Sequence, residues 1–120
     1  MDRKSVIREY QQRRRPMGVF QVRNLATGKV FICVSPDLPA MLNRQRAQLR
    51  LGMHPNRELQ ADWTAYGSEA FAFEVLDTLS HADRPDADPA TDLRVLEYMW
   101  LEKLAPYGAR GYNRVPRTAS

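Results

Sequence analysis

The sequence predicts an α+β fold in which a small three-stranded antiparallel sheet is flanked by helices, in the order β-β-α-α-β-α. Two β-branched and aromatic runs of strand length, residues 19–22 and 30–34, lie close together in the chain. A third run, residues 71–76, alternates large apolar side chains with smaller or polar ones and follows two segments of helical spacing. A chain of 120 residues can enclose one hydrophobic core, so these elements are expected to form one domain.

The first two strands are predicted to form a hairpin. Residues 24–28 between them supply turn chemistry, with Gly28 free to adopt a positive φ. A connection this short cannot hold a parallel crossover, so the two strands must be antiparallel.

Capping residues and apolar stripes place the helices. Ser35 or Asp37 can cap the first helix, and Gly52 ends it in a left-handed conformation. The second helix spans about residues 55–67, and the last helix spans about residues 91–104. The apolar residues expected to be buried on the first two helices are Leu38, Leu42, Leu49, Leu59, Trp63 and Tyr66.

Composition divides the chain into a basic N-terminal extension (residues 1–16), a folded domain (17–115) and a short tail (116–120), with an exposed acidic loop over residues 80–90. No apolar stretch is long enough to cross a membrane, and the N-terminus lacks the apolar centre of a secretory signal. Cys33 is the single cysteine, which excludes an intrachain disulfide and a cysteine-based zinc site. We therefore expect a cytoplasmic protein.

The net charge of +4 is unevenly distributed along the chain. The first 58 residues carry twelve Lys and Arg against four Asp and Glu, whereas residues 59–104 carry three against ten. Clustered positive charge favours phosphate-bearing partners, through Coulomb attraction and counterion release. For residues 13–15 alone, a solvated tail is the simpler interpretation. The residues expected to bind nucleic acid are Arg13, Arg14, Arg15, Arg23, Lys29, Arg44, Arg46 and Arg50.

One carboxylate lies inside the apolar stripe of the last helix. At helical spacing, Glu97 falls among apolar residues on the buried side. A carboxylate there costs desolvation energy unless a cation, a metal or a hydrogen-bond donor meets it. Spacing alone leaves two interpretations open: a structural ion pair with an arginine such as Arg44, or a functional ligand or acid in a cleft. The apolar residues of the stripe are Leu93, Leu96, Trp100, Leu101 and Leu104.

Several segments, in the same order, resemble the GIY-YIG nuclease family. Gly-Val-Phe at residues 18–20 and Phe-Ile-Cys at residues 31–33 resemble the paired motifs of its first hairpin. Glu97, three residues before Trp100, lies where that family keeps its metal-binding glutamate. The other segments that carry the resemblance are residues 24–30, 59–67, 73–76 and 111–113.

The resemblance implies a metal-dependent endonuclease that cuts phosphodiester bonds with one divalent cation, Mg²⁺ or Mn²⁺, bound by Glu97. It also implies a hairpin tyrosine that activates or positions water and a helix arginine that stabilises the phosphate. His54 lies where some members carry a histidine, although a residue directly before Pro55 is also typical of a helix cap. Asn113 matches the family's closing segment.

Several positions depart from the family pattern. Phe20 and Phe31 replace both signature tyrosines and have no oxygen to donate, accept or ionise. Met41 lies where the arginine is expected, and Arg44 follows about one helical turn later, where it could reach the same place. Cys33 replaces the glycine of the second motif, and with no paired histidine it is expected to be a buried apolar thiol.

These observations lead to one hypothesis and two alternatives. The hypothesis is a GIY-YIG-like domain that binds nucleic acid, DNA more than RNA, with weak or lost cleavage. One alternative is an active divalent-metal-dependent endonuclease that uses Glu97 and Arg44, in which Arg44, His54 or a metal-bound water covers the lost groups. The other alternative is a protein-interaction adaptor that uses the acidic loop. The candidate catalytic residues are Glu97, Arg44, His54 and Asn113. The sequence predicts no oligomeric state.

Overall fold

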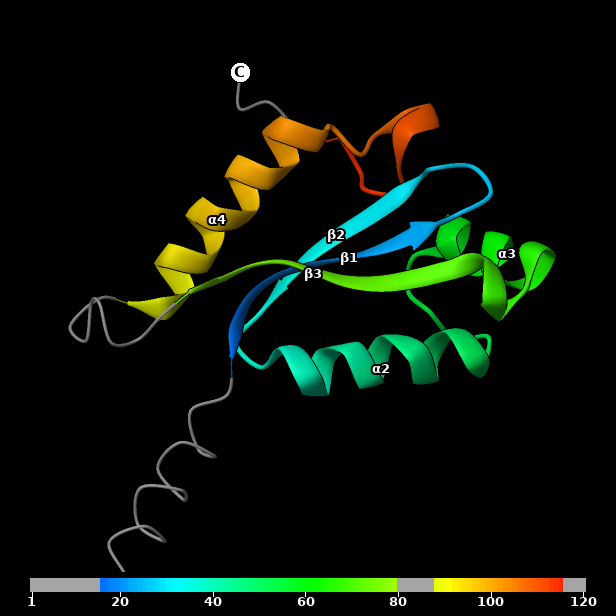
Figure 1. Cartoon of the computed structure of the whole chain (residues 1–120), viewed down its shortest axis with the longest axis horizontal. Helices are drawn as coiled ribbons and strands as arrows, with labels where there is room; N and C mark the ends of the chain where they lie inside the picture. Colours follow the sequence, from blue (N-terminus) through cyan, green and yellow to red (C-terminus); the bar gives the residue numbers. More distant parts are fainter. Residues whose placement is uncertain (1–15, 80–87, 116–120) are drawn as a thin grey trace, which may run out of the picture.

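The computed structural model describes residues 16–79 and 88–115. Most of the predicted N-terminal extension, most of the acidic loop and the tail lie outside the described residues. The predicted fold class is confirmed: a three-stranded antiparallel sheet carries helices on both faces (Figure 1). The strands are β1 (Met17–Asn24), β2 (Val30–Ser35) and β3 (Phe71–Leu79), in the order β2-β1-β3.

Three helices surround the sheet. Helix α2 (Leu38–Arg50) lies on the face opposite to α4 (Pro89–Leu104), and α3 (Arg57–Tyr66) lies near the hairpin turn (Figure 1). The side chains of Asp37, Asn56 and Asp88 cap α2, α3 and α4 respectively, each accepting a hydrogen bond from a backbone N–H of the first turn. No helix of the described residues is long and apolar enough to cross a membrane.

The hairpin is closed by the turn that the sequence predicts. The carbonyl of Asn24 accepts a hydrogen bond from the N–H of Gly28 at 2.7 Å, and Gly28 has φ +81°. The Asn24 side chain accepts hydrogen bonds from the N–H groups of Ala26 and Thr27, which is an Asx turn. In this register Phe20 lies opposite Cys33, and Val22 lies opposite Phe31.

A β-bulge interrupts the pairing of β1 with β3. Val19 is opposite Asp77 and Phe20 is opposite Val75, so Leu76 is the extra residue. Next to it the strands approach so closely that a Cβ on Gly18 would lie 2.0 Å from the Asp77 carbonyl oxygen. Val75 continues the alternation of Phe71 and Phe73 along β3 but is exposed, because it lies on an edge strand while α2 packs on β1 and β2.

The sheet separates two apolar clusters. Phe20, Val22 and Leu59 belong to the cluster shared with α2 and α3, whereas Val19 and Ile32 belong to the cluster shared with α4. The buried faces predicted for the helices are largely confirmed. The exception is Tyr66, which is exposed at the end of α3.

Candidate functional site

The candidate site lies along β2, an edge strand of the sheet. Glu97 is on α4, which packs against β2 and β1, and Leu96 beside it is buried in the α4 cluster. Cys33, in the middle of β2, packs instead against the cluster on the α2 side. The charge of Glu97 nevertheless contributes to raising the pKa of the Cys33 thiol, after the larger effect of burial. Glu97 therefore lies on the helix that packs against the strand of the second motif.

Glu97 is half-buried and uncompensated. Burial raises the pKa of its carboxyl group, because desolvation disfavours the charged form. Among the residues that the structure describes, it has no hydrogen-bond or ion-pair partner. The structural alternative left open by the sequence, an ion pair between Glu97 and Arg44, is therefore absent from the described structure.

The positions that lack catalytic groups are packed as apolar core. Phe20 is fully buried, and Phe31 is partly buried against the same cluster. Met41 packs against that cluster too, and its sulfur accepts a hydrogen bond from the Gln45 amide at 3.7 Å. These three side chains hold no ionisable or hydroxyl group at the site.

His54 is buried next to Phe31, with ring centroids 5.6 Å apart and an edge-to-face geometry. Its Nδ1 accepts a hydrogen bond from the Asn56 N–H at 3.0 Å, so the proton is on Nε2, which donates to Oε1 of Gln45. Burial lowers the pKa of the ring. Both nitrogens are occupied, and His54 therefore cannot ligate a metal or accept a proton without breaking a buried hydrogen bond.

Asn113 is used by the backbone of β2. Its Oδ1 accepts a hydrogen bond from the Ile32 N–H, and its Nδ2 donates to the Ile32 carbonyl, each at 2.9 Å. The preceding Gly111 forms a parallel bridge with Val30. Residues 111–113 therefore cover one end of the open edge of β2. The Asn113 side chain makes the two hydrogen bonds to Ile32 that a neighbouring strand would otherwise make.

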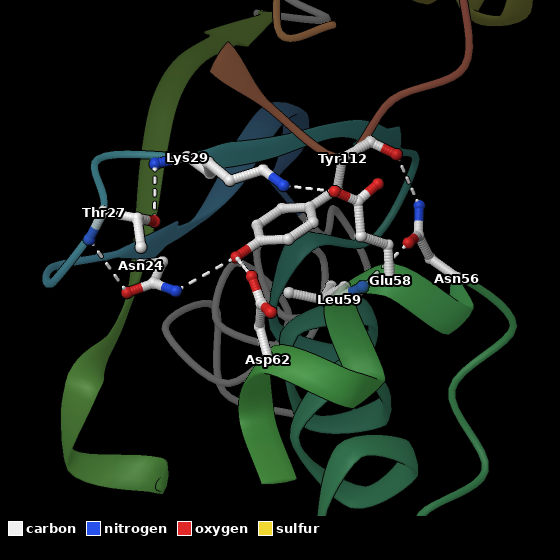
Figure 2. Close-up of polar contacts among 8 residues, drawn as sticks. All are labelled: Asn24, Thr27, Lys29, Asn56, Glu58, Leu59, Asp62 and Tyr112. Atoms are coloured by element: carbon white, nitrogen blue, oxygen red, sulfur yellow. Dashed lines mark hydrogen bonds and ion pairs between the residues drawn. The ribbon is translucent and has the colours of Figure 1, made fainter. Parts of the chain in front are cut away.

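Tyr112 anchors this closing segment through a buried polar network (Figure 2). Its hydroxyl donates to Oδ2 of Asp62 at 2.7 Å and accepts a hydrogen bond from Nδ2 of Asn24 at 3.1 Å. Its carbonyl accepts a hydrogen bond from the Asn56 side chain at 2.7 Å. Burial, followed by the bond to Asp62, raises the pKa of the Tyr112 hydroxyl.

The Tyr112 network connects the hairpin turn to α3. Asn24 shapes the turn, while Asn56 caps α3 and Asp62 lies on its second turn. Lys29 lies over the Tyr112 ring, 4.7 Å from the centroid, and pairs with Glu58 of α3 (Figure 2). Asn56, Glu58, Asp62 and Gln45 are not among the site residues that the sequence predicts. Only the capping pattern at Asn56, followed by an acidic first turn, is readable from the sequence.

The predicted basic surface is only partly free. Arg23 forms an ion pair with Glu74 at 2.8 Å, and Lys29 forms one with Glu58. Arg46 stacks on the Phe73 ring, 4.6 Å from its centroid. Arg44 and Arg50, exposed on α2, make no ion pair with any described residue. Residues 13–15 lie outside the described residues.

The described residues contain no group of three or more His, Cys, Asp or Glu side chains that could bind a metal ion. Glu97 fits a divalent cation only as a single protein ligand. Its carboxylate is partly desolvated and pairs with no cation in the part of the chain that the structure describes. Carboxylate oxygen is the donor that Mg²⁺ and Mn²⁺ prefer.

Comparison with known proteins identifies the fold. The chain matches the catalytic domain of the homing endonuclease I-TevI with a TM-score of 0.68 and 21% identity, over 83% of this chain and 99% of that chain. It matches an intron endonuclease I-TevI catalytic domain carrying a glutamate-to-alanine substitution with a TM-score of 0.69 and 20% identity, over 86% and 97%. No family model matches the sequence, and no curated protein matches it significantly. The chain thus has the fold of the GIY-YIG catalytic domain.

Proposed function

We propose that this GIY-YIG-like domain binds nucleic acid, DNA more than RNA, and that its phosphodiester cleavage is weak or lost. The observation that carries the proposal is the difference between the exposed arginines of α2 and the packed residues at the proton-handling positions. Arg44 and Arg50 of α2 are exposed and pair with no described residue, which leaves them available for phosphate, whereas the residues at the proton-handling positions have no free polar atom.

Binding is supported by the charge of α2 and the turn after it. Residues 38–57 contain four arginines and no acidic residue. Arg44 and Arg50 are exposed there without an ion pair to any described residue. Guanidinium groups bind phosphate oxygens in a bidentate manner, so this surface suits a nucleic-acid backbone.

Weak cleavage is supported by the state of each candidate catalytic group. Phe20 and Phe31 lack hydroxyls, and both ring nitrogens of His54 are engaged. One general acid–base group contributes on the order of 10²–10⁴ in rate, so the absence of two such groups is hard to offset. Asn113 holds the edge of β2 rather than a reacting atom.

Glu97 is the residue that would bind Mg²⁺ or Mn²⁺. A bound divalent cation supplies charge neutralisation at a phosphoryl oxygen and lowers the pKa of bound water. Its half-buried carboxylate, which has no ion-pair partner among the described residues, is also the specific observation that favours the alternative, an active endonuclease that uses Glu97 and Arg44.

A paired cleavage and binding assay tests the proposal. Wild type, Glu97→Ala and the control Glu102→Ala, which alters an exposed carboxylate on the same helix, are incubated with duplex DNA, single-stranded DNA and RNA in Mg²⁺ or Mn²⁺. We expect binding that weakens steeply between about 50 and 200 mM salt, with little cleavage.

Cleavage at ordinary enzyme rates, about 1–10³ s⁻¹, that is lost only in Glu97→Ala would establish the alternative. Failure to bind any nucleic acid at low salt would refute both versions and favour the adaptor interpretation.

A further inference from the structure

The loop between α2 and α3 exposes two large apolar side chains. Leu51 and Met53 are 72% and 71% exposed, the highest values among the large hydrophobic residues that the structure describes. Shallow hollows of about 430 and 570 Å³ flank them: Leu51 lines the first, and Met53 lines the second. The two side chains therefore stand on a ridge.

Hydrogen bonds hold the ridge in place. The N–H groups of Leu51 and Met53 donate to carbonyls of the last turns of α2, at 3.0 and 2.9 Å. Gln60 of α3 closes the loop from the other side: its Nε2 donates to the Leu49 carbonyl and its Oε1 accepts a hydrogen bond from the His54 N–H, each at 3.0 Å. The apolar side chains are thus presented by an ordered backbone, which lowers the entropic cost of using them in binding.

Every charged residue in the stretch 44–57, which carries the ridge, is an arginine. Arg50 directly precedes Leu51, and Arg57 follows Met53 after a few residues; both are exposed and without an ion pair to any described residue. Arg44 lies further back on α2, also exposed. An exposed apolar tip flanked by arginines that pair with no described residue is typical of proteins that insert a side chain between stacked bases while holding the flanking phosphates.

We propose that Leu51 and Met53 form a wedge that inserts between stacked bases of a DNA duplex, with Arg44, Arg50 and Arg57 on the adjacent phosphates. The inference rests on the proposed function as a nucleic-acid-binding domain. A wedge needs only one or two apolar side chains, whereas stable insertion into a lipid surface needs a longer apolar face. His54, next to Met53, contacts the Phe31 ring, so the unstacked step would lie beside the candidate site.

The test uses the whole chain and a set of duplexes carrying 2-aminopurine at successive positions, a base whose fluorescence rises when it is unstacked. The wedge variant is Leu51→Ser with Met53→Ser. The matched control is Val95→Ser with Met99→Ser, two exposed apolar residues on α4. A third variant, Arg50→Gln, alters a phosphate contact instead.

We expect wild type and the α4 control to raise the fluorescence at some position. The wedge variant should lose that rise and bind about tenfold more weakly, about 1.4 kcal/mol, with an unchanged salt slope. Arg50→Gln should keep the rise at saturation and lower the salt slope by about one.

Different failures overturn different claims. If the wedge variant binds duplex as wild type does, or if wild type binds with a steep salt dependence but unstacks no base, the wedge is refuted and the proposed function stands. If wild type binds no nucleic acid, the proposed function fails. If the wedge variant instead loses binding to phosphatidylserine vesicles while its duplex binding is unchanged, the ridge is a membrane contact and the wedge is again refuted.

Discussion

Replacing Tyr112 by phenylalanine removes one oxygen from the network that attaches the closing segment to the hairpin. Asn24 is fully buried, and without the hydroxyl its Nδ2 loses the side-chain acceptor that lies 3.1 Å away. An unsatisfied buried donor costs about 1–3 kcal/mol. The lost bond to Asp62, which is only partly buried, adds about 0.5–1 kcal/mol, because that carboxylate can turn to water. We therefore expect Tyr112→Phe to lower the free energy of unfolding by about 1.5–4 kcal/mol.

Urea denaturation followed by circular dichroism measures this change, with Tyr98→Phe as the control. Tyr98 also donates through its hydroxyl, to Glu102 at 3.0 Å, but it is 62% exposed. Its loss should cost less than about 0.5 kcal/mol. If the two variants are destabilised equally, or if Tyr112→Phe is as stable as wild type, the network does not anchor the segment.

Three further predictions concern stability. Phe20→Tyr places a hydroxyl in the fully buried core and should cost roughly 1–3 kcal/mol of unfolding free energy. Phe31→Tyr alters a half-buried ring and should cost less than about 0.5 kcal/mol. Equal urea midpoints for the two variants would contradict this. Burial lowers the pKa of His54, so below about pH 6.5 the unfolded state binds a proton more readily than the folded state, and wild type should lose at most about 1.4 kcal/mol of stability per pH unit. His54→Gln should lack this slope. Parallel pH profiles for the two proteins would refute the assignment of a lowered pKa to His54. Gly18→Ala should cost more than about 2 kcal/mol, because its Cβ would lie 2.0 Å from the Asp77 carbonyl oxygen, and a thermal midpoint equal to that of wild type would show that the bulge can move aside.

Most of the fold can be predicted from local chemistry. The Asn24–Gly28 turn fixes the hairpin, and Gly52 ends α2 with φ +74° as predicted. Alternation over residues 71–76 predicts β3, but it cannot reveal the bulge at Leu76. A bulge depends on how two distant strands meet, and no single strand encodes that.

The candidate site is less predictable, because its decisive contacts join distant segments. Helical spacing places Glu97 on the buried side of α4 but cannot tell whether a cation neutralises it. The sequence leaves His54 open as a catalytic residue or a helix cap, and only the positions of Gln45 and Asn56 show that both nitrogens are occupied. Asn113 matches a family motif, yet its bonds to Ile32 become visible only in three dimensions.

The docking of residues 111–113 on β2 has a consequence during synthesis of the chain. Ile32 and Asn113 are 81 positions apart, so nearly the whole domain must leave the ribosome before this edge of the hairpin is covered. Until then the Val30 carbonyl and both backbone groups of Ile32 face solvent on a strand able to pair with another nascent chain. The closing segment therefore ends a period of vulnerability to aggregation, and a polypeptide interrupted before Gly111 would retain that vulnerability permanently.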